Sequence, residues 1–159
     1  MKVSIICVGK IKEKFFRDAI DEYSKRLQRY CQLSIIEVQD EKTPDKAPLA
    51  IEEQIKEKEG MGILSKIKDD MLVCTLEIKG KKMTSEEMAG WINQSTVKGV
   101  SHIAFIIGGS LGLSKAVTDR ADMHLSFSDM TFPHQLMRVI LCEQIYRSFR
   151  IINNEPYHK

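Results

Sequence analysis

The stretch HIAFIIGGSLGLS, residues 102–114, runs from an apolar segment directly into a turn rich in glycine. Residues 102–107 show no polar alternation, which is typical of a strand buried on both faces of a sheet. Gly108, Gly109 and Gly112 follow, and glycine lets another group approach the backbone closely. The stretch therefore predicts a central strand with a binding loop at its carboxyl end. The alternative is that the glycines serve only a tight turn.

Similar strands recur along the chain and alternate with helical patterns. Strands are predicted at 3–8, 33–38, 71–78, 102–107 and 123–128, and helices at 13–30, 49–67, 84–96, 114–121 and 133–149. This alternation predicts an α/β fold over 1–159 as one domain, with a mostly parallel sheet and helices on both faces. Ligands in such folds bind beyond the carboxyl ends of the strands. KGKK (79–82, predicted as a turn), GGSLG (108–112) and SDMTFP (128–133) are therefore expected to share one pocket.

The composition excludes several classes of protein. No apolar stretch has the length of a membrane span, and the N-terminus has no signal-peptide pattern, so we expect a cytoplasmic protein without a membrane partner. The four cysteines lack metal-type spacing and are expected to be free core thiols, and the four histidines suit no metal site. Residues 1–30 carry eight basic and four acidic side chains, whereas 37–59 carry four basic and eight acidic ones. The chain is thus basic at one end and acidic in the middle.

The glycine turn does not match the common phosphate-binding motifs. Its pattern is G-G-x-x-G, whereas the dinucleotide fingerprint needs G-x-G-x-x-G after the first strand of a βαβ unit. The P-loop requires a lysine after its last glycine, and none stands there. A nucleotide-binding α/β protein is therefore disfavoured.

Four segments, in order, carry a resemblance to a known family. They are VGKIKEKF (8–15), IGGSLGL (107–113), LSFSDMTFPHQLMRVILCEQIYRSFRI (125–151) and the terminal NNEPYHK (153–159). Together they resemble the ribosomal RNA large subunit methyltransferase H family, of the SPOUT class, over essentially the whole chain.

This resemblance implies a fold, a cofactor and a reaction. In the SPOUT class the C-terminal part of the sheet is tied in a trefoil knot, although protein chains are in general not knotted. The loops of the knot bind S-adenosylmethionine (SAM), and the enzyme is a homodimer. The implied reaction is methylation of N3 of a pseudouridine in helix 69 of the 23S rRNA, on the assembled 70S ribosome.

The SAM contacts of the family fall on two loops and one strand end. They correspond to Leu76, Gly108, Phe127, Ser128, Asp129, Met130, Thr131 and Phe132, and we add Gly109. The two phenylalanines would form apolar walls, and the loop backbone would bind the adenine edge. Other interpretations remain for single residues: Leu76 as a plain core residue, and Ser128, Asp129 or Thr131 as the cap of the following helix.

Candidate catalytic residues lie at the two ends of the last predicted helix. N3 of pseudouridine must lose its proton, so a base or a cation that stabilises the developing anion is expected. His134 and Arg138 are four residues apart and share a helix face. We expect them to act as a pair, with Arg138 as the electrostatic stabiliser; the alternative for His134 is a surface residue at a helix start.

The terminal residues Tyr157 and His158 are expected to reach the pocket of a partner subunit and contact the flipped base. The alternative is a frayed terminus. Arg147 has the charge to contact a phosphate, but Glu143 four residues earlier offers it an ion pair.

A rival function belongs to another class. A non-enzymatic ribosome-associated protein would use its basic N-terminal segment and its tail, and would carry a vestigial pocket. Binding of SAM separates these two hypotheses.

Overall fold

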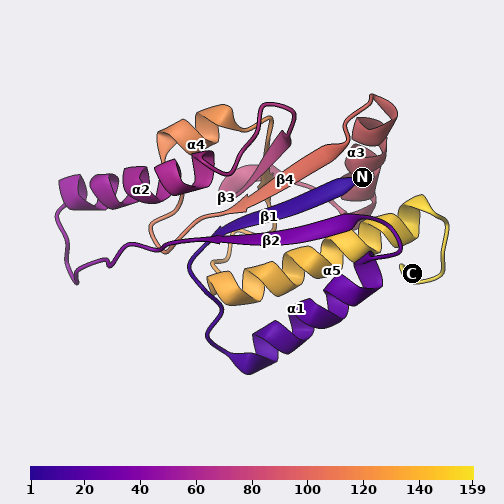
Figure 1. Ribbon diagram of the computed structural model, residues 1–159, viewed down its shortest axis with the longest axis horizontal. Coiled ribbons are helices and arrows are strands. Elements are labelled where there is room, and N and C mark those ends of the chain that lie inside the picture. Colours follow the sequence, from indigo (N-terminus) through magenta and orange to yellow (C-terminus); the bar gives the residue numbers. More distant parts are fainter.

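The computed structural model describes residues 1–159, in which strands and helices alternate (Figure 1). The strands are β1 (Lys2–Val8), β2 (Gln32–Val38), β3 (Leu72–Lys82), β4 (His102–Ile107) and β5 (Met123–Ser126). The helices are α1 (Lys14–Leu27), α2 (Leu49–Leu64), α3 (Ser85–Val97), α4 (Lys115–Arg120) and α5 (His134–Ile152). All neighbouring strands pair in parallel, in the order β2-β1-β4-β3-β5. The predicted α/β fold with a parallel sheet is confirmed.

Helices cover both faces of this sheet. Figure 1 shows α2 and α4 on one side, with α1 and α5 on the other. Strand β4 explains why the opening stretch lacks polar alternation. Ile103, Phe105 and Ile107 belong to the core beneath α1, α3 and α5, whereas Ala104 and Ile106 belong to the core beneath α2 and α4. All five are at most 3% exposed, so each face of the strand is packed.

The start of α3 has a side-chain cap, whereas the start of α5 has none. Thr84 Oγ1 accepts from the Glu87 backbone N–H at 3.1 Å, and the Glu87 carboxylate accepts from the Thr84 N–H at 2.7 Å. Helix α5 begins after Pro133 without any side-chain cap. The alternative in which Ser128, Asp129 or Thr131 caps this helix is therefore wrong. Pro133 itself occupies the N-cap position and has no side-chain acceptor to offer.

The prediction of a turn at KGKK is also wrong, because this segment continues β3. The pairing of β3 with β5 shifts between Leu76 and Lys81, and then resumes at Lys81 and Lys82. Gly80 permits the close return of the strand, since a Cβ there would lie 2.7 Å from the carbonyl carbon of Leu125. Such an irregularity re-aims the side chains beside it. Residues 77–79 thus leave the ladder at the carboxyl edge of β4.

The four cysteines are buried and free, as predicted. Burial raises the pKa of both the Cys7 and the Cys31 thiols to about 11, so they stay protonated at neutral pH. No helix combines the length and the apolar character that crossing a membrane requires. The trefoil knot stays a prediction. It is compatible with a sheet in which β5 lies beyond β3 and the following helix α5 returns to the face of α1 and α3.

Candidate active site

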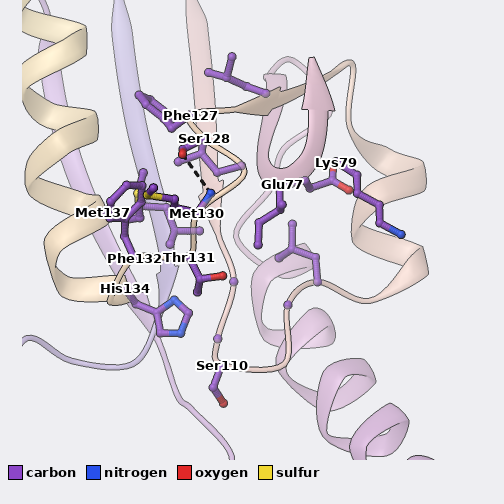
Figure 2. A pocket seen from close by; sticks show the side chains of 18 of the residues that line it. Glu77, Lys79, Ser110, Phe127, Ser128, Met130, Thr131, Phe132, His134 and Met137 are labelled. Carbon is purple, nitrogen blue, oxygen red and sulfur yellow. Dashed lines mark hydrogen bonds between the residues drawn. The ribbon is translucent and has the colours of Figure 1, made fainter. Parts of the chain in front are cut away.

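A cavity of about 440 Å³ lies at the carboxyl edge of β4 and β5. Three segments enclose it: residues 76–79 of β3, the glycine turn 107–113, and 125–132 with the loop after β5. Figure 2 shows Glu77 and Lys79 on one side of this space and the loop from Phe127 to Phe132 on the other. The three expected segments do share one pocket, although β3 contributes 76–79 rather than a turn at 79–82.

The walls of this cavity combine apolar faces with a few polar groups. Leu76, Phe127, Phe132 and Met137 supply apolar surface. The loop after β5 is held by Ser128, whose Oγ accepts from the Met130 N–H at 3.0 Å (Figure 2). Such a mixture suits a drug-sized ligand with one flat apolar part, and the volume lies in the range of about 300–1,000 Å³ that such ligands use.

The glycine turn is tight, and each of its glycines meets a different requirement. Gly112 has φ +89°, and its N–H donates to the Gly109 carbonyl at 3.1 Å. A Cβ on Gly108 would lie 2.9 Å from Leu113 Cδ2, and one on Gly109 would lie 2.8 Å from Glu59 Oε1. The turn itself and helix α2 therefore exclude side chains here. The turn alone is thus reason enough for a glycine at position 108, and the close approach of a cofactor to its backbone stays a prediction.

Glu77 places a carboxylate on the cavity wall. It accepts a hydrogen bond from the Thr75 hydroxyl at 2.6 Å and also contacts His124 Nδ1. Thr75 is fully buried, so these bonds fix the rotamer of the glutamate. A fixed carboxylate beside an apolar slot can accept from ribose hydroxyls or pair with an ammonium or sulfonium group. SAM carries each of these groups, so the residues present fit it.

Most of the predicted SAM contacts line this cavity. Those that do are Leu76, Gly108, Gly109, Phe127, Ser128, Met130, Thr131 and Phe132. Asp129 does not line it. Its carboxylate pairs with Lys82 Nζ at 2.6 Å on the surface instead. The structure therefore gives Asp129 no contact with the cavity through its side chain.

A second cavity of about 740 Å³ adjoins the first and is far more polar. Gly109, Ser110 and His134 line both cavities and form their common wall. Lys10 and Lys12 stand exposed at the second cavity, which we call the polar cavity. A group transferred from a ligand in the first cavity to a ligand in the polar cavity would pass this common wall.

His134 and Arg138 share a helix face as predicted, but only His134 reaches both cavities. Burial, and to a smaller extent the positive charge of Arg138, lower the pKa of His134, so its imidazole is neutral at pH 7. Neutral imidazole offers one N–H donor and one lone pair.

Arg138 is 1% exposed and bound on three sides. It donates to the carbonyls of Val8 at 2.9 Å and Gly9 at 2.7 Å, and to the Glu37 carboxylate at 3.0 Å. Its guanidinium ties α5 to the ends of β1 and β2 and does not line the first cavity. Both terminal nitrogens of the guanidinium already donate and only Nε has no partner, so the geometry favours a structural role for Arg138, although its side chain lines the polar cavity. The sequence pattern finds a shared helix face but does not show which partner is buried.

The tail residues lie against their own subunit and away from both cavities. The Tyr157 hydroxyl donates to Glu143 at 3.1 Å, and its ring packs on Tyr146 with centroids 5.0 Å apart. His158 contacts Arg147 at 3.1 Å and Glu86 at 2.7 Å. The ion pair of Glu143 and Arg147 is confirmed at 2.7 Å. The structure does not bring Tyr157 and His158 to the cavity of their own chain, and the tail is held rather than frayed.

Several lining residues escaped the sequence analysis. They are Glu77, Ile78, Ile107, Leu113, Leu125 and Met137, whereas Lys79, Ser110, Leu111 and Gly112 stand in segments that were expected at the pocket. Met137 had a usable signal, since it stands three residues after His134 on one helix face. Glu77 and Ile78 had none, because the irregularity of β3 has no local sequence pattern except Gly80.

The fold and the two cavities define a class of protein. A parallel α/β sheet that holds a nucleoside-sized, mainly apolar cavity beside a polar one is suited to an enzyme that transfers a group between two bound ligands. The family described as "Predicted SPOUT methyltransferase" matches residues 1–158. The chain belongs to the SPOUT methyltransferase family.

Two full-length relatives agree with this assignment, and a solved structure agrees with the fold. The chain is 65% identical to "Ribosomal RNA large subunit methyltransferase H" of Clostridium beijerinckii and 63% identical to that of Clostridium botulinum strain Langeland, in each case over the full length of both chains. A probable methylase family protein from Haemophilus influenzae superposes with a TM-score of 0.52 at 12% identity, over 99% of this chain and 70% of that one. This last likeness supports the fold alone.

Proposed function

We propose that the protein transfers a methyl group from SAM to N3 of a pseudouridine in helix 69 of the 23S rRNA, on the assembled ribosome. The observation that carries the proposal is the pairing of an apolar, nucleoside-sized cavity with a polar cavity across the common wall of Gly109, Ser110 and His134. The names of the full-length relatives support rRNA of the large subunit as the substrate.

The first cavity would hold the methyl donor. SAM supplies an electrophilic methyl group on a sulfonium sulfur. Leu76, Phe127 and Phe132 would enclose the adenine, and the backbone of residues 127–132 would bind its edge. The Glu77 carboxylate, fixed by Thr75, would accept hydrogen bonds from the ribose or face the positive charge. These contacts orient the donor, and orientation alone supplies much of the rate of a displacement reaction.

The polar cavity would receive the acceptor base. His134 stands at the common wall with a neutral imidazole, which can donate its N–H to a ring carbonyl as negative charge develops on the base. Lys10 and Lys12 would contact the phosphates that flank an extruded nucleotide. No residue of this chain is assigned to metal chemistry here.

We infer that the enzyme works as a homodimer. Support comes from Tyr157 and His158, which contact Glu143 and Glu86, whereas α5 lines the cavity only with residues of its first turns. A tail that takes part in the reaction would therefore act on a second copy. We also propose that the protein works in the cytoplasm, where it would meet ribosomes.

Calorimetry and a transfer assay test the proposal together. SAM is expected to bind one site per chain, whereas ATP and NAD are not. Labelled SAM should methylate 70S ribosomes from a strain that lacks this protein, and free 50S subunits should react far more slowly. No binding of SAM at millimolar concentration would favour the vestigial binding module, and label on a different base would overturn the substrate.

A further inference from the structure

One buried carboxylate in the polar cavity, that of Glu59, plays no part in the methyl transfer proposed above. Glu59, on α2, is 6% exposed, and no lysine, arginine or histidine lies within ion-pair distance of it. Its Oε2 accepts the backbone N–H of Glu41 at 3.0 Å. Its Oε1 accepts nothing from the protein and lies beside Gly109, at the wall common to both cavities.

A structural role does not require an acid at this position. The Glu41 N–H needs one acceptor, and the amide oxygen of a glutamine would serve it equally well. A buried carboxylate without a counter-ion opposes folding, because the charged form loses its hydration. Asp40 and Glu41, on the loop after β2, add negative charge next to it, and burial with these charges raises the pKa of Glu59. Residues that oppose folding in this way are concentrated at functional sites.

The surroundings of Glu59 indicate what its free oxygen is for. Lys10, Lys12, His134 and Arg138 line the same cavity and supply donors. Three more carboxylates line it too, but Glu37 pairs with Arg138, Glu41 pairs with Lys58, and Asp40 is exposed. A uracil-type ring matches this arrangement, because its carbonyl oxygens accept and its ring nitrogen carries an N–H. In such a cavity the N–H of the ring needs an acceptor. Glu59 Oε1 lies beside the Gly109 backbone, where the polar cavity meets the cavity for the methyl donor.

We propose that the polar cavity binds the acceptor nucleobase and that Glu59 is the catalytic residue that accepts its ring N–H proton. This inference rests on the proposed function. The N–H bond breaks and its proton joins the Glu59 carboxylate. The nitrogen lone pair forms the new N–C bond, while the C–S bond breaks with its electron pair on sulfur. The Glu59 proton then leaves to water, so that methylated base and S-adenosylhomocysteine remain.

The physical properties of Glu59 suit this step. A general base works best when its pKa lies near the working pH, and burial moves a carboxyl toward that range from below. His134 remains free to donate to a ring carbonyl, because its pKa is lowered and the imidazole is neutral. The two groups would thus act at neighbouring atoms of one ring.

The test compares Glu59→Gln with Glu57→Gln in the full-length protein. Glu57 is exposed on the same helix and makes no ion pair, which makes it a matched control. For each variant we would measure thermal unfolding, SAM affinity by calorimetry, and single-turnover methyl transfer to 70S ribosomes between pH 5.5 and 9.

For Glu59→Gln we expect an unfolding temperature no lower than that of the wild type and a SAM affinity within threefold of it. Methyl transfer should fall by at least about 100-fold, as expected for loss of a general base. The fall in wild-type rate at low pH should be absent from the residual activity. Glu57→Gln should match the wild type in all three measurements.

The results that would contradict this inference can be told apart from one another. If Glu59→Gln transfers methyl groups within threefold of the wild type, Glu59 is not the base, although the proposed function stands. A tenfold loss of SAM affinity, or a lower unfolding temperature, would show that the carboxylate shapes the fold and would also overturn the inference. If the wild type itself methylates no ribosome, the proposed function fails, and this inference fails with it.

Discussion

Replacing Arg138 by methionine should lower the free energy of unfolding. It should leave methyl transfer nearly unchanged. The guanidinium is 1% exposed and donates to two backbone carbonyls and one carboxylate. A hydrogen bond that involves a charged group contributes about 1.5–3 kcal/mol. The bond to Glu37 contributes less, because that carboxylate is 38% exposed.

The two hydrogen bonds from Arg138 to backbone carbonyls therefore determine how much stability is lost. At the lower end of that range they amount to about 3 kcal/mol, and methionine retains most of the apolar packing of the arginine stem. With a urea dependence of about 2 kcal/mol per molar, the midpoint of unfolding should fall by about 1.5 M. Urea titrations followed by the fluorescence of Trp91 would measure this shift, at one fixed protein concentration since a dimer unfolds in a concentration-dependent way.

Lys14→Met is the control, because Lys14 lies exposed on the surface of α1 and pairs only with Asp18. Its unfolding midpoint should not change measurably. Below the transition, SAM affinity and methyl transfer by Arg138→Met should stay within a few fold of the wild type. A variant that unfolds like the wild type but transfers no methyl groups would refute this reasoning and return Arg138 to the reaction.

Three further predictions concern a glycine at the cavity, a ring in the core and the buried carboxylate. Gly108→Val should reduce SAM affinity at least tenfold in calorimetry, because its Cβ would press on Leu113; Gly90→Ala, with open space around its Cβ, should bind SAM normally. Phe105→Ala should lower the free energy of unfolding by about 3–5 kcal/mol in urea titrations, since this ring is fully buried. Glu59→Gln should raise the free energy of unfolding at pH 8. The gain should disappear in acid, because a carboxyl with a raised pKa opposes folding above that pKa and ceases to do so once it is protonated.

Strands with unbroken apolar runs could be predicted closely from the sequence. Strand β4 is an example: each of its residues from 103 to 107 packs on one face or the other, so every position must be apolar and the pattern has no gaps. The loop after β5 was located for a related reason, since a parallel sheet brings the ends of its strands to one edge. Its contact residues, however, came from the resemblance and not from periodicity.

The errors arose where distant segments decide the local structure. Lysine-rich KGKK resembles a turn, yet it pairs with β5 because Gly80 lets the strand pass within 2.7 Å of Leu125. Arg138 and His134 share a face of α5 in the sequence pattern. The positions of β1 and β2 bury Arg138 and occupy the terminal nitrogens of its guanidinium, whereas His134 lies at the wall between the two cavities.

Glu59 illustrates the same limit most clearly. In the sequence it is one of several acids on a charged helix, and nothing nearby marks it as buried. Its position follows from Gly60, whose missing side chain lets α2 approach the residue after the glycine turn: a Cβ on Gly60 would lie 2.3 Å from Ser114 Oγ. That approach presses the Glu59 carboxylate against Gly109, which in turn must lack a side chain. Two glycines far apart in the chain thus bring an acidic helix to the wall between the cavities, and this contact is what makes Glu59 available to a ligand.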